Sequence, residues 1–307
     1  MKKQKKYYGV IVPMVTPFTE QGKLDEAATI KILDLIVSNG AFPFILGTTG
    51  EAASIPFQTR VQLSKLVLKQ VEQRTTIYAG ISDNCLENSV TLAQELYKLG
   101  IRVFVAHLPS YYPLTPDMML RYYETLAERC PGELMIYNIK STTHMSLPLE
   151  VIERLSQHPK IVGLKDSERD VERLNSLAVK FSGRQDFCLL CGWTAQSTKM
   201  LLMGFDGIVP STGNLIPKKF VDLYKAVQRG DITIANKLQA EIAPIADLHQ
   251  KDMLGSESIA ALKVMMSELG LCLPWVLPPL IRLKPEKEQQ IKNQMRTILS
   301  GKPLQKS

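Results

Sequence analysis

The chain alternates short apolar runs with amphipathic stretches, without a break, from its start to about residue 230. Each run is long enough for one buried strand, and the stretches between the runs have the periodicity of helices. Eight strand–helix units in a row predict a (β/α)8 TIM barrel rather than a doubly wound sheet. A dinucleotide-binding sheet would also need a Gly-x-Gly-x-x-Gly turn after its first strand, where residues 13–17 read Pro-Met-Val-Thr-Pro. The predicted strands are Gly9–Val12, Pro43–Leu46, Thr76–Ala79, Val103–Ala106, Leu134–Tyr137, Ile161–Leu164, Phe187–Leu190 and Gly207–Val209.

Residues that begin and end helices stand between these predicted strands. Asp25, Thr115 and Asp170 occupy N-cap positions, where a side-chain oxygen accepts a hydrogen bond from the first helical turn. Gly40 and Gly100 stand where helices should end, because glycine adopts the left-handed conformation that closes a helix. The chain therefore contains boundary signals as well as hydrophobic periodicity.

The strand pattern stops after residue 230, and three helical segments follow it. They cover residues 232–251, 256–269 and 286–299. No flexible linker marks a second domain. The predicted organisation is a barrel over residues 1–230 and a C-terminal helical region over residues 231–307, packed on the barrel or on a neighbouring subunit.

Charge and composition exclude two classes of protein. The net charge is +7, but much of the excess lies near the two ends of the chain, where we expect solvated tails. The sequence has no basic stripe with interleaved aromatic residues, so nucleic-acid binding is not predicted. No run reaches the roughly 18 apolar residues of a membrane span, and no signal-peptide cleavage site follows the first lysines. The terminal lysines are Lys2, Lys3, Lys5, Lys6, Lys302 and Lys306.

The cysteines and histidines predict neither disulfides nor a metal site. Five scattered cysteines, an odd number, agree with a reducing, cytoplasmic compartment. Cys188 and Cys191 have the spacing of a redox or metal pair. Alternation along a strand would point their sulfurs to opposite faces, so two buried thiols are favoured. The four histidines are widely spaced, and no zinc cluster is expected.

Lys165 ends the sixth apolar run, directly before Asp166. Alternation places Ile161, Gly163 and Lys165 on one face of the strand, and Gly163 leaves space beside the lysine stem. A desolvated amine loses its proton more readily and becomes a nucleophile, as a Schiff-base enzyme requires. The alternative is a lysine whose ammonium reaches solvent from the end of the strand.

Three further segments stand near the carboxyl ends of predicted strands, where a TIM barrel has its active site. The Gly-Thr-Thr-Gly-Glu loop at Gly47–Glu51 offers hydroxyls and amides to a carboxylate, or is an ordinary turn. Tyr137 ends the fifth strand, where it can transfer protons to a substrate on Lys165 or serve as a core tyrosine. Tyr111–Tyr112 lies in a loop after the fourth strand. A phosphate site at Ser211–Asn214, after the eighth strand, is a rival interpretation.

Short motifs follow one another in a fixed order along most of the chain. They are Thr16-Pro17-Phe18, Gly22-x-Leu24-Asp25, Gly47-Thr48-Thr49-Gly50-Glu51, Pro109-x-Tyr111-Tyr112, Tyr137-Asn138, Gly163-x-Lys165-Asp166, Gly204-x-Asp206-Gly207 and Asn214. In this order and spacing, the sequence resembles the dihydrodipicolinate synthase/N-acetylneuraminate lyase family of class I aldolases. The resemblance implies a barrel with a C-terminal helical region, usually a tetramer. It also implies an enzyme that binds pyruvate or another 2-keto acid as an imine on its lysine.

The resemblance assigns roles to the four residues nearest the imine. Lys165 would form the Schiff base, and Tyr137 would be the general acid/base. Thr48 would relay protons. Thr48 and Thr49 together would hold the carboxylate of the keto acid.

Further roles follow from the same resemblance. Tyr111 would be the aromatic residue that one subunit contributes to the site of its neighbour, or Tyr112 if the loop is shifted by one residue. Gly192 and Val209 fall where backbone carbonyls of the family face the site. No metal or organic cofactor is implied.

The second-substrate half of the site departs from the family. The synthases usually follow Tyr-Asn with an arginine that binds the carboxylate of the second substrate, and Thr142 occupies its place. Losing a bidentate guanidinium is a large change, and Lys140 and His144 are the two candidates to replace its charge. The sialic-acid lyases usually have an Asp-Glu pair after the seventh strand, where this chain has Trp193 and the residues that follow it.

The resulting hypothesis is a cytoplasmic, homo-oligomeric class I lyase, similar to dihydrodipicolinate synthase. Pyruvate condenses with Lys165, and an aldehyde is the second substrate. A sugar-acid aldolase or dehydratase, of the N-acetylneuraminate or 2-keto-3-deoxy-sugar-acid type, is the nearest alternative. A non-catalytic sensor that binds a keto acid is the alternative from another class. It would not need the lysine, the tyrosine and both threonines together.

Overall fold

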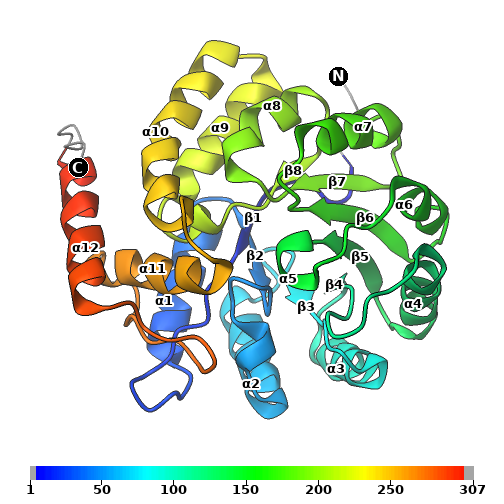
Figure 1. Cartoon of the computed structure of the whole chain (residues 1–307), viewed down its shortest axis with the longest axis horizontal. Coiled ribbons are helices and arrows are strands. Elements are labelled where there is room, and N and C mark those ends of the chain that lie inside the picture. The colour runs from blue at the N-terminus through cyan, green and yellow to red at the C-terminus, as the bar shows by residue number, and fades with distance from the viewer. Residues whose placement is uncertain (1–4, 301–307) are drawn as a thin grey trace.

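The computed structural model of the protein describes residues 5–300. Eight parallel strands pair in chain order, and β1 pairs with β8 to close the barrel (Figure 1). Each strand overlaps one of the eight predicted runs, so the predicted (β/α)8 barrel is confirmed. The strands are β1 (Gly9–Pro13), β2 (Phe42–Ile45), β3 (Tyr78–Gly80), β4 (Val103–His107), β5 (Glu133–Asn138), β6 (Ile161–Asp166), β7 (Cys188–Cys191) and β8 (Gly207–Ile208).

Helices surround the strands and continue beyond the last one (Figure 1). The helices that follow strands β1 to β8 are α1 (Glu26–Ser38), η1 (Ala52–Ser54), α2 (Phe57–Val71), α3 (Leu86–Leu99), α4 (Pro116–Arg129), α5 (Lys140–Thr143), α6 (Leu149–Leu155), α7 (Val171–Phe181), η2 (Thr194–Gln196), α8 (Ser197–Leu202), η3 (Ser211–Asn214) and α9 (Pro217–Arg229). The C-terminal helices are α10 (Ile232–Gln250), α11 (Gly255–Glu268) and α12 (Pro285–Leu299). None of the helices in the described part of the chain is long and apolar enough to cross a membrane.

The predicted helix boundaries are confirmed by the capping geometry. The side chain of Asp25 accepts a hydrogen bond from the first turn of α1, and Thr115 and Asp170 do the same for α4 and α7. Gly40 follows α1 with a φ of 78°, and Gly100 closes α3 with a φ of 124°. These φ values lie in the region that favours glycine, which explains why the two helices end there.

The strands separate two apolar layers. Side chains inside the barrel, such as Phe44, Tyr78 and Met135, form one buried cluster, and side chains such as Leu164 form the layer between strands and helices. Cys188 belongs to the inner cluster, and Cys191 to the outer one. The prediction that the two thiols point to opposite faces is therefore confirmed, and all five cysteines are free.

The predicted alternation of β6 is wrong at its first two residues. Leu134 pairs with Ile161, but the next residue of β5 pairs with Gly163, so Val162 is an extra residue. This irregularity puts Ile161 in the helix-side layer and turns Val162 toward the barrel interior. Beyond it, Gly163 and Lys165 face the interior as predicted. The space beside Gly163 is filled by Cys188, because a Cβ at this glycine would lie 2.4 Å from its sulfur.

Of the two N-terminal lysines that the structure describes, Lys5 differs from the expected solvated tail and Lys6 agrees with it. The Lys5 ammonium donates hydrogen bonds to the Phe187 carbonyl at 2.9 Å and to Asp206 at 2.8 Å, and its side chain is 6% exposed. Lys5 thus fastens the chain start to the barrel. Lys6 is largely exposed and pairs with Glu133. The other terminal lysines, Lys2, Lys3, Lys302 and Lys306, lie outside the described residues.

The C-terminal helices pack on the barrel itself. α10 lies along α9, and its Gln239 accepts hydrogen bonds from the amide and hydroxyl of Thr198 in α8. His249, near the end of α10, bonds Thr212 in the loop after β8 at 2.9 Å. α11 follows and α12 packs against it (Figure 1). Helices α10 and α11 therefore lie against the barrel, and α12 packs on their outer side (Figure 1); the domain boundary near residue 230 remains a prediction.

Candidate active site

Lys165 lies at the carboxyl end of β6, inside the barrel. Its Cα is paired with that of Tyr137 on β5. The lysine Nζ lies 3.8 Å from the centre of the Tyr137 ring and 4.9 Å from the centre of the Phe44 ring. Only 4% of the residue is exposed. Burial lowers the pKa of the Lys165 ammonium, and the neighbouring Tyr137 opposes part of this effect.

No carboxylate forms an ion pair with Lys165 among residues 5–300. The adjacent Asp166 is fully buried and faces the other way, where Arg173 donates to it at 2.8 Å and Asn138 at 3.0 Å. These bonds fix the end of β6 to the segment after β5. The lysine therefore keeps an amine that has no ion-pair partner in the described chain and is easily deprotonated, on a rigid strand.

The Gly47–Glu51 loop follows β2 and brings Thr48 and Thr49 to the same cavity as Lys165. The amides of Gly50 and Glu51 close the turn by donating to the carbonyls of Gly47 and Thr48. Over the described chain, the amides of Thr48 and Thr49 donate to no other group. Thr48 and Thr49 thus bring to the cavity wall two N–H groups and two hydroxyls that suit a carboxylate.

A buried ion pair supports this loop from behind. Glu51 has a left-handed backbone, with a φ of 58°, and its carboxylate pairs with the ammonium of Lys263 in α11. Both side chains are fully buried. Glu51 also accepts the Leu277 amide at 2.8 Å, and Lys263 donates to the Trp275 carbonyl at 2.7 Å. The C-terminal region therefore holds the loop that carries the two threonines.

These residues enclose a cavity of about 170 Å³ at the carboxyl ends of the strands. Gly192 and Val209, which were predicted to face the site, line it as well. A Cβ at Gly192 would lie 1.9 Å from the Ser167 hydroxyl oxygen, so only glycine fits there. A second cavity, of about 560 Å³, adjoins the first and shares Thr48 and Tyr137 with it.

Tyr111 and Tyr112 lie outside both cavities. Their rings contact each other, 4.9 Å between centres, and the residues are 75% and 69% exposed. Asn84 fixes their loop by accepting the Ser110 amide at 2.8 Å. Within one chain the structure does not bring Tyr111 to Lys165, so its role in the site of a neighbouring subunit remains a prediction.

Thr142, in the segment after β5, lines both cavities. Lys140 and His144, the two basic residues that were candidates to replace the family's arginine, line neither. Lys140 Nζ lies 3.2 Å from Glu168, and the lysine lines neither cavity. His144 is exposed, and it also lies outside both cavities. Besides Lys165 and His249, the basic residue that lines the smaller cavity is the exposed Arg169, in the loop after β6.

Helices α10 and α11 form one wall of the smaller cavity through His249, Ser258 and neighbouring residues. His249 is fully buried between Thr212 and Ser258, at 2.9 and 3.2 Å, and burial lowers its pKa to about 4. The imidazole is therefore uncharged near neutral pH. Its two hydrogen bonds connect the segment after β8 with helices α10 and α11.

Sequence reasoning missed Phe44, Arg169, His249 and Lys263. Phe44 lies in an ordinary apolar run and His249 among the mostly polar residues 247–252, and neither has a local signal. Lys263 had a signal, because it interrupts the apolar run at residues 260–266. Arg169 had a weaker signal, since it lies four residues after the lysine in the loop of a strand end.

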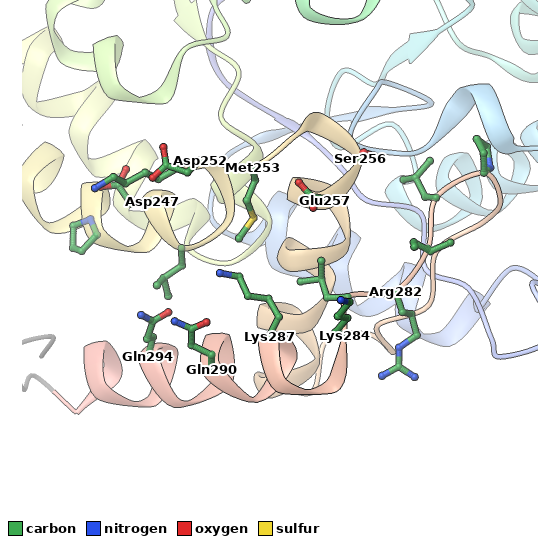
Figure 2. A pocket seen from close by; sticks show the side chains of 17 residues that line it. Asp247, Asp252, Met253, Ser256, Glu257, Arg282, Lys284, Lys287, Gln290 and Gln294 are labelled. Carbon is green, nitrogen blue, oxygen red and sulfur yellow. The ribbon is translucent and has the colours of Figure 1, made fainter. Parts of the chain in front are cut away.

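A larger hollow, of about 820 Å³, lies between the end of α10, the start of α11 and α12. Figure 2 shows Lys287 and Gln290 of α12 on one side of it and Asp247 and Asp252 on another. It shares no residue with the cavity around Lys165 and contains no strand end. The candidate active site is therefore the smaller cavity.

Sequence comparison finds relatives over most of the chain. The 4-hydroxy-tetrahydrodipicolinate synthase of Pseudomonas aeruginosa is 28% identical over 289 residues, which cover 94% of this chain and 97% of that protein. The enzyme of the same name from Neisseria meningitidis serogroup C is 29% identical, over 90% of this chain and 93% of that protein.

Solved structures of similar proteins have the same fold. Dihydrodipicolinate synthase from Bacteroides thetaiotaomicron superposes with a TM-score of 0.90 at 26% identity, over 96% of this chain and all of that one. A prophage protein of the dihydrodipicolinic acid synthase family from E. coli K12, solved in complex with pyruvate, also gives 0.90, at 25% identity over 96% of this chain and 99% of that one. The model of the dihydrodipicolinate synthetase family matches residues 6–298. The chain belongs to the dihydrodipicolinate synthetase family.

Proposed function

We propose that this enzyme is a class I lyase in which Lys165 forms a Schiff base with pyruvate or a similar 2-keto acid. The observation that carries the proposal is the buried Lys165 amine, with its lowered pKa, 3.8 Å from the Tyr137 ring in a cavity that also contains Thr48 and Thr49. The pyruvate complex of the structural relative from E. coli K12 supports the choice of keto acid.

The chemistry uses these groups in order. The Lys165 amine adds to the C2 carbonyl of the keto acid, and loss of water gives the imine. The carboxylate lies at the free amides and hydroxyls of Thr48 and Thr49. Loss of a proton from C3 gives an enamine, with Tyr137 and Thr48 moving protons. C3 then bonds to the carbonyl carbon of an aldehyde, whose C=O π bond opens and whose oxygen takes up a proton. Water hydrolyses the imine, which releases the product and the Lys165 amine.

Borohydride trapping tests the imine directly. Incubation with pyruvate and sodium borohydride should add one reduced pyruvyl group to the protein, and peptide mapping should place it on Lys165. Lys263 is an internal control, because it is equally buried but engaged by Glu51. A reduced adduct at any other lysine, or none at all, would contradict the proposal.

Tyr137→Phe tests the proton transfer. The ring that packs against Lys165 is kept and the hydroxyl is lost, so the fold should be unchanged. Turnover should fall by roughly 100-fold or more, the usual contribution of a general acid/base. Single-turnover kinetics should assign the loss to the proton-transfer steps. Near-normal turnover would mean that Tyr137 only packs in the core.

The same proposal extends to the second substrate, the oligomeric state and the cellular location of the enzyme. A carboxylate-bearing aldehyde, as in dihydrodipicolinate synthase chemistry, is the first choice for the second substrate. The hydroxyls of Ser141, Thr142 and Ser211 along the cavity favour a sugar-acid aldolase as the second candidate. The exposed Tyr111 and Tyr112 support a homo-oligomer, a tetramer or a dimer, and the free cysteines support a cytoplasmic location.

A further inference from the structure

The cavity around Lys165 has basic side chains but no acidic one on its wall. We infer that Arg169 binds a carboxylate of the second substrate. It would thus replace the carboxylate-binding arginine whose place is taken by Thr142. This inference rests on the proposed imine chemistry, since it concerns the partner that the enamine attacks.

Arg169 is the basic group that remains available near the site. Lys140 is paired with Glu168 at 3.2 Å, and Arg173 lies 2.8 Å from Asp166 and 3.6 Å from Glu168. Among the described residues, the Arg169 guanidinium has neither a hydrogen bond nor an ion pair. Glu168 and Asp166 are therefore engaged by Lys140 and Arg173, and the exposed Arg169 guanidinium is left available to a ligand.

The loop that carries Arg169 is fixed at both ends. On one side, the Asp166 carboxylate accepts the amide of Glu168 at 2.9 Å. On the other, Asp170 accepts the Arg173 amide at 3.1 Å as the N-cap of α7. The position of Arg169 relative to Lys165 is therefore set by the backbone, although its long side chain can move.

The barrel places Arg169 across from the site proposed for the keto-acid carboxylate. Thr48 and Thr49 follow β2, whereas Arg169 follows β6, and these strands are four apart in a closed ring of eight. Two negative groups, one on each substrate, would then occupy opposite sides of the cavity. This separation reduces their mutual repulsion.

The surroundings of Arg169 suit a carboxylate. A guanidinium donates two parallel hydrogen bonds to a carboxylate and remains charged at all working pH values. Ser141 and Thr142, after the adjacent strand β5, line the same cavity and add hydroxyl groups. The pair of loops after β5 and β6 thus forms a small anion-binding corner, without the arginine that the family usually places after β5.

Two aldehydes that differ only in the carboxylate provide the test. Succinic semialdehyde and butanal have the same carbon count, with a carboxylate replaced by a methyl group. The unmodified protein, supplied with pyruvate, should use the semialdehyde with the higher kcat/KM. Arg169→Gln should lower kcat/KM for the semialdehyde by roughly 10- to 150-fold, the usual worth of hydrogen bonds to a charged group. Its kcat/KM for butanal should stay within about twofold.

Control variants separate a direct contact from a general charge effect. Lys140→Gln removes one positive charge from α5, outside the cavity, while Asn138 and Ser146 still donate hydrogen bonds to Glu168, so the preference for the semialdehyde should be unchanged. Arg169→Lys should restore part of the preference. Borohydride trapping of pyruvate by Arg169→Gln should match that of the unmodified protein, because the imine forms without Arg169.

Three results would overturn the inference. They are an unmodified protein that does not prefer the semialdehyde, an equal loss of both aldehydes in Arg169→Gln, and an equal effect of Lys140→Gln. If the unmodified protein forms no borohydride adduct on Lys165, the proposed function itself fails. The two failures are therefore distinguishable.

Discussion

Lys165→Met should abolish turnover and leave a protein at least as stable as the original. Methionine keeps most of the side-chain volume between the rings of Phe44 and Tyr137 but cannot form an imine. Loss of a covalent nucleophile should reduce kcat by on the order of 10⁴-fold or more, as for other nucleophile deletions. Borohydride trapping should disappear with it.

The gain in stability has its own physical reason. Lys165 is buried without an ion-pair partner in the described chain, and burial lowers its pKa, so at neutral pH the unfolded state binds its proton more tightly. An apolar residue removes that cost. We expect a gain of about 1 kcal/mol in the free energy of unfolding, measured by urea denaturation at pH 7. The difference should shrink as the pH rises toward the ordinary lysine pKa of about 10.5, because above it the lysine is neutral in both states.

Two outcomes would contradict this account. Residual turnover of Lys165→Met close to that of the unmodified protein would show that the reaction does not use the imine. A large loss of stability would show that the amine has a structural partner. Lys199→Met, in helix α8, is the control for the general effect of replacing a lysine by methionine.

Lys263→Met should have the largest effect on stability. The change leaves the Glu51 carboxylate buried with a single hydrogen bond, from the Leu277 amide. Removing one partner of a buried ion pair costs about 3–5 kcal/mol. Lys218→Met, which breaks an exposed pair with Asp222 on α9, should cost only about 0.3–0.5 kcal/mol. Urea denaturation of the two variants measures the difference.

The same substitution should also weaken pyruvate binding. Glu51 ends the loop that carries Thr48 and Thr49, and its left-handed backbone is favoured only while its carboxylate is held. The pyruvate concentration needed for half-maximal trapping should therefore rise. The double variant Lys263→Met/Glu51→Gln should regain part of the lost stability, because no buried charge remains unpaired. If the single variant is as stable as the original, the pair is not a structural support.

The strands and helix caps were predictable because their signals are local. A buried strand needs a continuous apolar run, and Asp25 or Asp170 bonds a backbone amide three residues away. The order of Lys165 and Tyr137 on adjacent strands also followed, since parallel strands in a barrel end at one face. These features depend on a few neighbouring residues.

Features that depend on distant segments were not predictable. The reversal at Ile161 and Val162 is set by pairing with β5, and the space at Gly163 is filled by a cysteine from β7. Glu51 and Lys263 are more than 200 residues apart. The pairing of Lys140 with Glu168 was also not predictable from the sequence. Because of it, Arg169 rather than Lys140 is the basic residue near the second-substrate half of the cavity.

The two halves of the site differ in what supports them. Lys165 and Tyr137 are anchored in paired strands, whereas Arg169, Ser141 and Thr142 stand on loops and a short helix. Substitutions on those loops can alter which molecule is accepted while the bond-making groups stay in place. Directed evolution toward new aldehydes should therefore succeed by varying residues 141, 142 and 169. Related barrels can thus change their aldehyde substrate while they keep the same imine-forming lysine and its tyrosine.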